Sequence, residues 1–384
     1  MSTIIQDTAR NTLIRWTSNA LRGGYARGAA LSPFTSPVEG NGYKRSALAT
    51  SEAIRGAGGE FWFDPMTHAL NMPRAGDFRF YDDWQLWSGT RGDFSTPTLV
   101  RDHVERVFAV QAQLQAPGLA PTFLVSYPDT PRSQAALDMS AEAVRQSPTS
   151  WLTIAGDQQF WSSGAELDAH IGALDQLQPG GWLLTIARGD NAMPPAATPE
   201  EIFGLMRTTY ALSQDRPVRV AFGDVAALPA VAAGAEAVGT GWDMRQRLCA
   251  YQDFEERQAD TGAGGGAWYQ RPTLRGLMGG LSNGEYDVLV SERPTLALRL
   301  TPGTIGPQAE QAFAHHATVL TTVIDDLRSR SGQDRVDTLR AAYVAAVGEW
   351  PEVQRVTSTR LAASRWNTPF LQGVDLFRDS EGWI

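Results

Sequence analysis

The polar residues best suited to chemistry in this chain stand just after short apolar segments. They are, in chain order, Asp64 with His68, Asp129, Asp157 with Gln158, Arg188 with Asp190, and Asp243. Carboxyl groups can exchange protons with a ligand, and side-chain amides can read a planar polar ligand. Several carboxylates on one rim are costly unless each is hydrogen-bonded, paired with arginine or bound to a cation. Because placing these carboxylates together costs free energy, we expect that they are kept for a function.

Each of these residues also has a purely structural interpretation. Asp64 stands before a proline and could belong to a turn. Asp129 and Asp157 could each cap the helix that follows. Arg188 and Asp190 could form an ordinary surface ion pair, which contributes little to stability.

A second candidate site follows from glycines late in the chain. Gly239 and Gly241 flank Thr240, and this spacing lets backbone amides approach a ligand closely and hold a phosphate group. The five histidines give little support for a metal site, and His315 and His316 point about 100° apart on one helix. The sequence contains no HExxH, GxSxG, P-loop or GxGxxG motif, so hydrolase, NTPase and Rossmann functions lack motif support.

A repeating unit positions these residues: a short apolar strand, a loop with Asp, Gly or Pro, and an amphipathic helix. The predicted strands cover 29–33, 60–65, 121–128, 150–157, 181–190, 217–224 and 236–242. Predicted helices between them include 44–58, 98–115, 134–146, 165–177 and 198–214. This alternation indicates a parallel sheet with right-handed crossovers, and the nearly continuous apolar strands indicate burial on both faces.

We therefore expect an α/β protein with a (β/α)8 TIM-type barrel, with an open doubly wound sheet as the alternative. The missing eighth strand would lie in 78–84 or 286–291. In a barrel, the candidate residues after the strands would meet at the carboxyl face, where barrel enzymes place their active sites.

The expected barrel occupies residues 1–250 and carries a Trp-rich insertion around 66–120, which would either shape the pocket or decorate the surface. Residues 251–384 begin with a Gly-rich stretch at 262–266 and continue as a C-terminal helical extension. In this extension, 308–327 and 336–350 carry apolar residues at helical spacing. These helices should pack on the barrel or form a homodimer or protein-complex interface.

Composition narrows the class of protein. The chain has 384 residues, of which 42% are hydrophobic and 20% are charged, as expected for a globular protein with a full core. A net charge of −9 does not favour nucleic acid as the partner, and Cys249, the single cysteine, excludes an internal disulfide. With no signal peptide and no apolar run of about 18 residues, we expect a cytoplasmic protein.

Four segments resemble the tRNA-guanine transglycosylase barrel superfamily. They are FWFDPMT (61–67), LVSYPDTPRSQAALDMSAEAVRQ (124–146), WLTIAGDQQF (151–160) and VRVAFGDVAALPAVAAGAEAVGTGWDMR (218–245), and the resemblance extends over 25–247. It implies that Asp64 is the general acid/base and that Asp129 and Gln158 read a flat heterocycle. The family nucleophile is a late-strand aspartate, for which Asp243 is the candidate here. The family's cysteine–histidine zinc site is absent, since the chain has one cysteine.

These observations support three hypotheses. The first is a zinc-independent, transglycosylase-like transferase or hydrolase that needs no cofactor and acts on a nucleobase or nucleoside glycosidic bond. In it Asp64 and Asp243 are catalytic. The groups that bind substrate are His68, Asp129, Asp157, Gln158, Arg188, Asp190, Gly239 and Gly241. The second is a barrel enzyme for a phosphorylated small molecule, and the third is an inactive barrel that serves as a scaffold.

Overall fold

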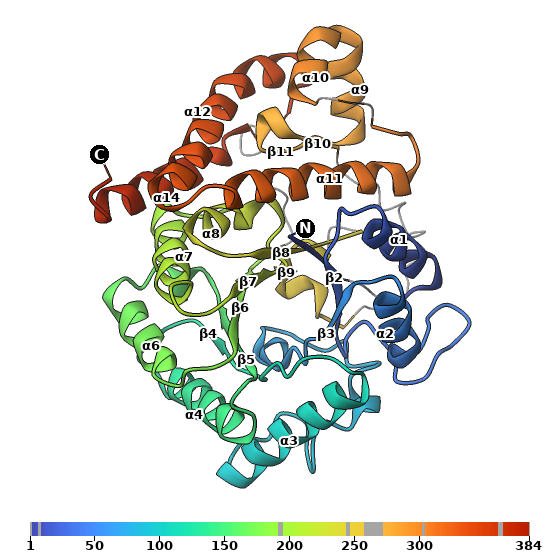
Figure 1. The fold of residues 1–384 in the computed structure, drawn as a ribbon, viewed down its shortest axis with the longest axis vertical. Coiled ribbons are helices and arrows are strands. Elements are labelled where there is room, and N and C mark those ends of the chain that lie inside the picture. Colours follow the sequence, from blue (N-terminus) through green and yellow to red (C-terminus); the bar gives the residue numbers. More distant parts are fainter. Residues whose placement is uncertain are drawn as a thin grey trace.

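The chain folds around a curled parallel β-sheet that is surrounded by helices, as the computed structural model shows (Figure 1). The structure describes residues 2–6, 9–190, 195–242, 246–256, 272–301, 303, 305–359 and 364–383. The Gly-rich stretch 262–266 and Asp243 therefore lie outside the described residues. No helix in the described ranges is long and apolar enough to cross a membrane.

Eight parallel strands of the described chain form the sheet. They are β1 (Thr3–Gln6), β2 (Gly28–Leu31), β3 (Glu60–Phe63), β4 (Leu124–Val125), β5 (Trp151–Gly156), β6 (Gly181–Arg188), β7 (Val218–Ala221) and β8 (Ala237–Gly241). Their order is β3-β2-β1-β8-β7-β6-β5-β4, and β9 (Cys249–Ala250) adds in parallel to the end of β6.

The seven strands predicted from sequence correspond to β2 through β8, but the expected position of the eighth strand was wrong. The eighth strand is β1, at the N-terminus, where it joins β2 to β8. Residues 78–84 include a short 3-10 helix, and 286–291 lie within a C-terminal helix. A four-residue strand, TIIQ, is too short to show a periodic pattern in the sequence.

The strand order is that of a barrel, but the barrel is not closed by hydrogen bonds. No strand pairing joins β3 to β4 within the described ranges, so the structure shows a curled half-barrel. The expectation of a complete TIM-type barrel is thus met only in part. The side chain of Gln111 bridges this seam instead, with hydrogen bonds to Phe63 and Leu119.

Helices cover the outside of the curled sheet (Figure 1). Those between strands are α1 (Asn11–Arg22), α2 (Ala47–Gly56), α3 (Pro97–Gln113), α4 (Pro131–Gln146), α5 (Gln158–Trp161), α6 (Ala165–Asp175), α7 (Pro199–Leu212) and α8 (Leu228–Ala233). Three of them, α3, α4 and α7, start at a Thr-Pro pair. In each case the threonine side chain caps the helix, and the proline occupies the first turn, where its missing N–H costs nothing.

The remaining helices follow the sheet and pack along one side of it, against α1, α7 and α8 (Figure 1). They are α9 (Asn283–Glu292), α10 (Pro294–Leu300), α11 (Ala309–Arg328), α12 (Gly332–Thr357) and α14 (Asn367–Ser380). Short elements complete the description: η1 (Thr67–Asn71), η2 (Asp82–Trp84), η3 (Asp224–Ala227), η5 (Tyr251–Asp253), η6 (Arg275–Leu277), β10 (Thr273–Leu274) and β11 (Gly279–Gly280).

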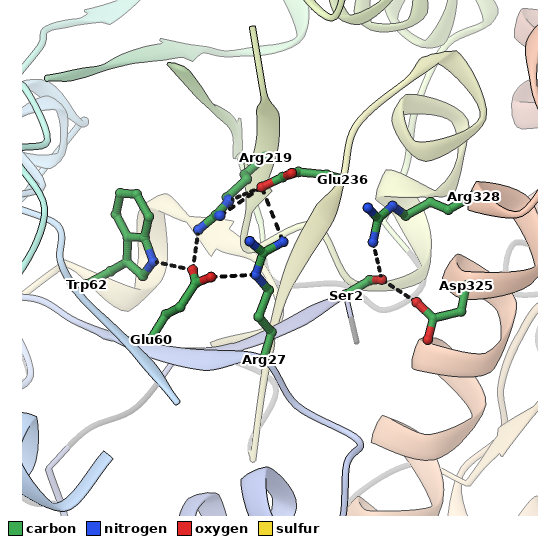
Figure 2. A network of polar contacts seen from close by, with 8 residues as sticks. All are labelled: Ser2, Arg27, Glu60, Trp62, Arg219, Glu236, Asp325 and Arg328. Carbon is green, nitrogen blue, oxygen red and sulfur yellow. Dashed lines mark hydrogen bonds and ion pairs between the residues drawn. The ribbon is translucent and has the colours of Figure 1, made fainter. Parts of the chain in front are cut away.

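A charged cluster closes the amino-terminal end of the curled sheet (Figure 2). The buried Arg219 donates to Glu60 at 2.7 Å and to Glu236 at 2.7 Å. Arg27 donates to the same two carboxylates. The Arg219 guanidinium also lies over the rings of Trp62 and Trp151. This end is filled by paired charges and aromatic rings, so the space for a ligand lies at the opposite end.

Candidate functional site

A pocket of about 1240 Å³ opens at the carboxyl ends of β1 and β2. Its floor includes Gln6, Ala30 and Ser32, and its walls come from 10–13, 41–44, 76–82 and 253–256, together with other residues. Part of the Trp-rich insertion therefore shapes the pocket, which was one of its two expected roles. The carboxyl-face position matches that of ligand sites in α/β proteins, and the volume exceeds the usual range of about 300–1,000 Å³.

Asp64 directly follows β3 and stands two residues before Met66, which lines the pocket. Its carboxyl group is buried, and Oδ1 accepts a hydrogen bond from the backbone N–H of Met66 at 2.8 Å. Oδ2 is buried and has no hydrogen-bond partner among the described residues. Burial disfavours the charged form and raises the pKa of Asp64 to about 6. The side chain is thus prepared to gain or lose a proton near neutral pH.

Gln6, at the end of β1, lies close to Asp64. Both side chains line a cavity of about 20 Å³, large enough for one water-sized group. Gln6 and Ala30 line both the large pocket and the small cavity, so the two spaces adjoin at these residues. Only 7% of Gln6 is exposed, yet its amide makes no hydrogen bond within the described ranges. Buried amides are normally satisfied, so this one is available to a ligand.

The pocket that Gln6 lines also includes Phe222, which follows β7. Its φ of 51° places it in the left-handed region, which is unusual for a bulky residue. The half-buried Phe222 lines the pocket. Such strain persists only where surrounding contacts impose it, and it is concentrated at functional sites.

The outer part of the pocket combines cations with aromatic rings. Arg91 pairs with Asp82 at 2.6 Å and stacks on Phe78. Arg10 and Arg79 also line the pocket and have no carboxylate partner in the part of the chain that the structure describes. Asp77 and Glu256 line the same pocket, so it offers both cationic and anionic groups to a ligand, and its aromatic walls suit a planar one.

His68, which follows β3, and Cys249, beside the end of β6, are in contact. The Cys249 Sγ lies 4.0 Å from His68 Nε2, and both residues are buried. Burial lowers the pKa of His68 to about 4, and it raises the pKa of Cys249, aided by the charges of Asp64 and Asp253. Both groups are thus neutral at pH 7, so they lack the charges of a thiolate–imidazolium pair. His68 does not line the large pocket.

A second cleft of about 740 Å³ lies over β4 and β5. Asp157 lines it and caps α5, since its Oδ1 accepts from the backbone N–H groups of Gln159 and Phe160. Its Oδ2 accepts from Ser126 at 2.5 Å and from Tyr251 at 3.3 Å. The capping interpretation of Asp157 is confirmed, and its carboxylate is fully used by the protein.

The structure separates the other predicted site residues from Asp64. Asp129 is exposed beside the second cleft, and its neighbour Thr130 is the residue that caps α4. Gln158 lies half-buried in α5. The surface-pair interpretation of Arg188 is wrong, because Arg188 is buried and forms an ion pair with Glu201 at 2.5 Å, while Asp190 is exposed.

The two late glycines make room for side chains. A Cβ atom at Gly239 would lie 2.8 Å from Gln6 Nε2, and one at Gly241 would lie 2.0 Å from Gln246 Cβ. Their missing side chains thus allow Gln6 and Gln246 to lie across the end of the sheet. Phosphate binding by these glycines remains a prediction.

Sequence reasoning missed Gln6 and Phe222. The one signal for Gln6 was a polar residue ending a short apolar segment, the same pattern that identified Asp64. No group of three or more His, Cys, Asp or Glu that could hold a metal ion occurs among the described residues.

Two comparisons with known proteins found no match to this chain. No protein-family model matches the chain, and no curated protein is similar enough to count as a match.

Proposed function

We propose that this protein is an enzyme that breaks or exchanges the glycosidic bond of a nucleobase or nucleoside, with Asp64 as the proton donor to the departing base. The observation that carries the proposal is the buried Asp64 carboxyl group, whose Oδ2 is unpartnered within the described ranges. A protein gains no stability from such a group, because burying it without a partner costs free energy. Function is the physical reason to keep it.

The chemistry requires a proton at one atom. When the bond between the sugar carbon and the base nitrogen breaks, its electron pair stays on the base, and the Asp64 proton neutralises it. Water or a second base then bonds to the sugar carbon and releases a proton. Asp253, also in the pocket wall, supplies negative charge for the developing sugar cation. The resemblance assigns the nucleophile to Asp243, which lies outside the described residues.

The pocket supports this choice over a scaffold. A scaffold function predicts that the rim carboxylates are all used as caps or in ion pairs. Asp157 fits that prediction, but Asp64 does not. The aromatic walls and the large volume suit a nucleoside-sized ligand.

The test measures release of free base from a panel of purine and pyrimidine nucleosides by chromatography. Asp64→Asn should lower kcat by about 10²- to 10⁴-fold. Wild-type activity should fall as pH rises above about 6, because Asp64 then loses its proton. Asp287→Asn, an exposed change on α9, is the matched control and should leave the rate unchanged. Equal rates for wild type and Asp64→Asn, or no base release from any nucleoside, contradict the proposal.

A second candidate is that the ligand carries a phosphate group. The observation that favours it is the position of Arg10 and Arg79 at the pocket mouth without carboxylate partners among the described residues. Guanidinium groups bind phosphate through paired hydrogen bonds. A nucleoside monophosphate should then bind more tightly than its nucleoside, and the double change Arg10→Gln with Arg79→Gln should remove the difference.

A further inference from the structure

We propose that Gln6 recognises the hydrogen-bonding edge of the ligand heterocycle and that Phe222 supports the ring. This inference rests on the proposed function for its site, but it names a recognition residue and a ligand class that the reaction alone does not. The ligand class is a planar heterocycle that presents an N–H donor and a C=O acceptor side by side.

The first step is that the Gln6 amide is free. Only 7% of the Gln6 surface is exposed, and the amide makes no hydrogen bond in the described part of the chain. Gln6 contributes to both the large pocket and the small cavity that Asp64 also lines. A primary amide holds one acceptor and two donors, so it can form two hydrogen bonds to a neighbouring donor–acceptor pair.

The second step is that the neighbours of Gln6 leave room. In the sheet register Gln6 stands between Ala30 on β2 and Gly241 on β8. A Cβ atom at Gly239 would approach Gln6 Nε2 to 2.8 Å, so glycine there preserves the space that the amide occupies. Gln246 occupies the space over Gly241, so a flat ring would reach the amide from the side of Ala30, where the neighbouring side chain is small.

The third step concerns an aromatic residue of the pocket wall. Phe222 contributes to the same pocket as Gln6, and its positive φ is a backbone conformation that the surrounding structure must impose. An aromatic ring at a pocket wall stacks on any planar base, whereas hydrogen bonds to the base edge distinguish one base from another. Phe222 thus contributes affinity and Gln6 contributes selectivity.

The experiment compares hypoxanthine with unsubstituted purine by isothermal titration calorimetry at pH 7. Both have the same ring system, but only hypoxanthine offers the N–H and C=O edge. Wild-type protein should bind hypoxanthine about tenfold more tightly than purine. Gln6→Leu and Gln6→Glu should reduce this ratio to near one, and Gln6→Glu keeps the size of the side chain. Thermal melting of both variants shows that they fold.

Gln158→Leu tests the rival recognition residue that the resemblance implies. A ratio that survives Gln158→Leu and is lost in both Gln6 variants supports the inference. A ratio unchanged by the Gln6 variants, or no binding of either base, overturns it. Binding of free bases requires no turnover. Loss of the proposed reaction with the ratio intact would therefore remove the catalytic proposal and leave this one standing.

Discussion

Gln111 and Leu119 exchange two hydrogen bonds, as two residues on neighbouring strands would. The Gln111 Nε2 donates to the Leu119 carbonyl at 2.8 Å, and the Leu119 N–H donates to Gln111 Oε1 at 3.0 Å. The same Nε2 donates to the carbonyl of Phe63, the last residue of β3, at 3.0 Å. A side-chain amide from α3 therefore takes the place of a peptide group at the seam between β3 and β4, which are not paired.

Replacing this amide should be strongly destabilising. Gln111→Leu leaves one buried N–H and two buried carbonyls without partners, and we expect a loss of about 2–4 kcal/mol in the free energy of unfolding. Urea denaturation measures it. Gln113→Leu, an exposed change two residues away on the same helix, should lie within about 0.5 kcal/mol of wild type. Equal stability of the two variants would show that the seam does not depend on Gln111.

The Asp64 carboxyl should make stability depend on pH. Its pKa rises from an ordinary 3.8 to about 6 on folding, so the folded state favours the protonated form. Stability is fully present below about pH 4 and is lost as pH rises toward 6, with a penalty of about 3 kcal/mol above that. Asp64→Asn should therefore stabilise the protein by about 1–3 kcal/mol at pH 8 and have little effect at pH 4.

Denaturation of wild type and Asp64→Asn at the two pH values checks this prediction, since the difference between the proteins cancels the titration of other groups. Asp287→Asn is again the control. A variant that is less stable than wild type at pH 8 would mean that the Asp64 carboxylate has a partner.

Arg219 should not tolerate replacement by lysine. Its guanidinium bridges Glu60 and Glu236 and lies against the contacting rings of Trp62 and Trp151, with Cζ at 4.8 and 4.6 Å from their centroids. A lysine ammonium cannot form the planar fork or stack in the same way, so Arg219→Lys should cost about 2–3 kcal/mol. Arg27→Lys, which changes the more exposed cation of the same cluster, should cost less than about 1 kcal/mol. Thermal denaturation compares the stabilities of the two lysine variants. Equal losses of stability would contradict the stacking argument.

The adjacent histidines of α11 should respond in opposite ways. His316 is buried, with Nε2 at 3.1 Å from Asp224 and Nδ1 at 2.7 Å from the Thr273 hydroxyl. His316→Leu removes these two contacts and a third, at 3.0 Å between Nε2 and the Thr240 hydroxyl, and should cost about 2–4 kcal/mol. Both ring nitrogens of His315 are buried without a hydrogen bond within the described ranges, so His315→Leu should be neutral or slightly stabilising. Chemical denaturation measures the free energy of unfolding of the two variants. Similar losses of stability in both would contradict the prediction.

The different surroundings of these histidines were predictable from helical geometry alone, because consecutive residues on a helix point about 100° apart. The same local reasoning predicted seven strands, since each combined a buried apolar run with turn residues. It also placed Asp64 at a strand end. It failed for β1, whose four residues show no period, and for the seam, where a helix side chain replaces a strand partner.

The site shows the same division. Asp157 could be recognised as a helix cap because the capped amides follow it within three residues. Arg188 could not be assigned, because its partner Glu201 comes from the next helix. Gln6 and Asp64 are 58 residues apart in the sequence and share a cavity only because β1 and β3 both flank β2.

The sequence by itself determined the alternation of strands and helices and the position of Asp64, because these depend on local backbone preferences and on the burial of nearby residues. The tertiary structure decided which strand completes the sheet, that β3 and β4 remain unpaired, and that the Gln6 amide and Asp64 Oδ2 lack partners among the described residues. Hydrogen-bond satisfaction depends on groups that are distant in sequence, so it emerges only when the chain is folded.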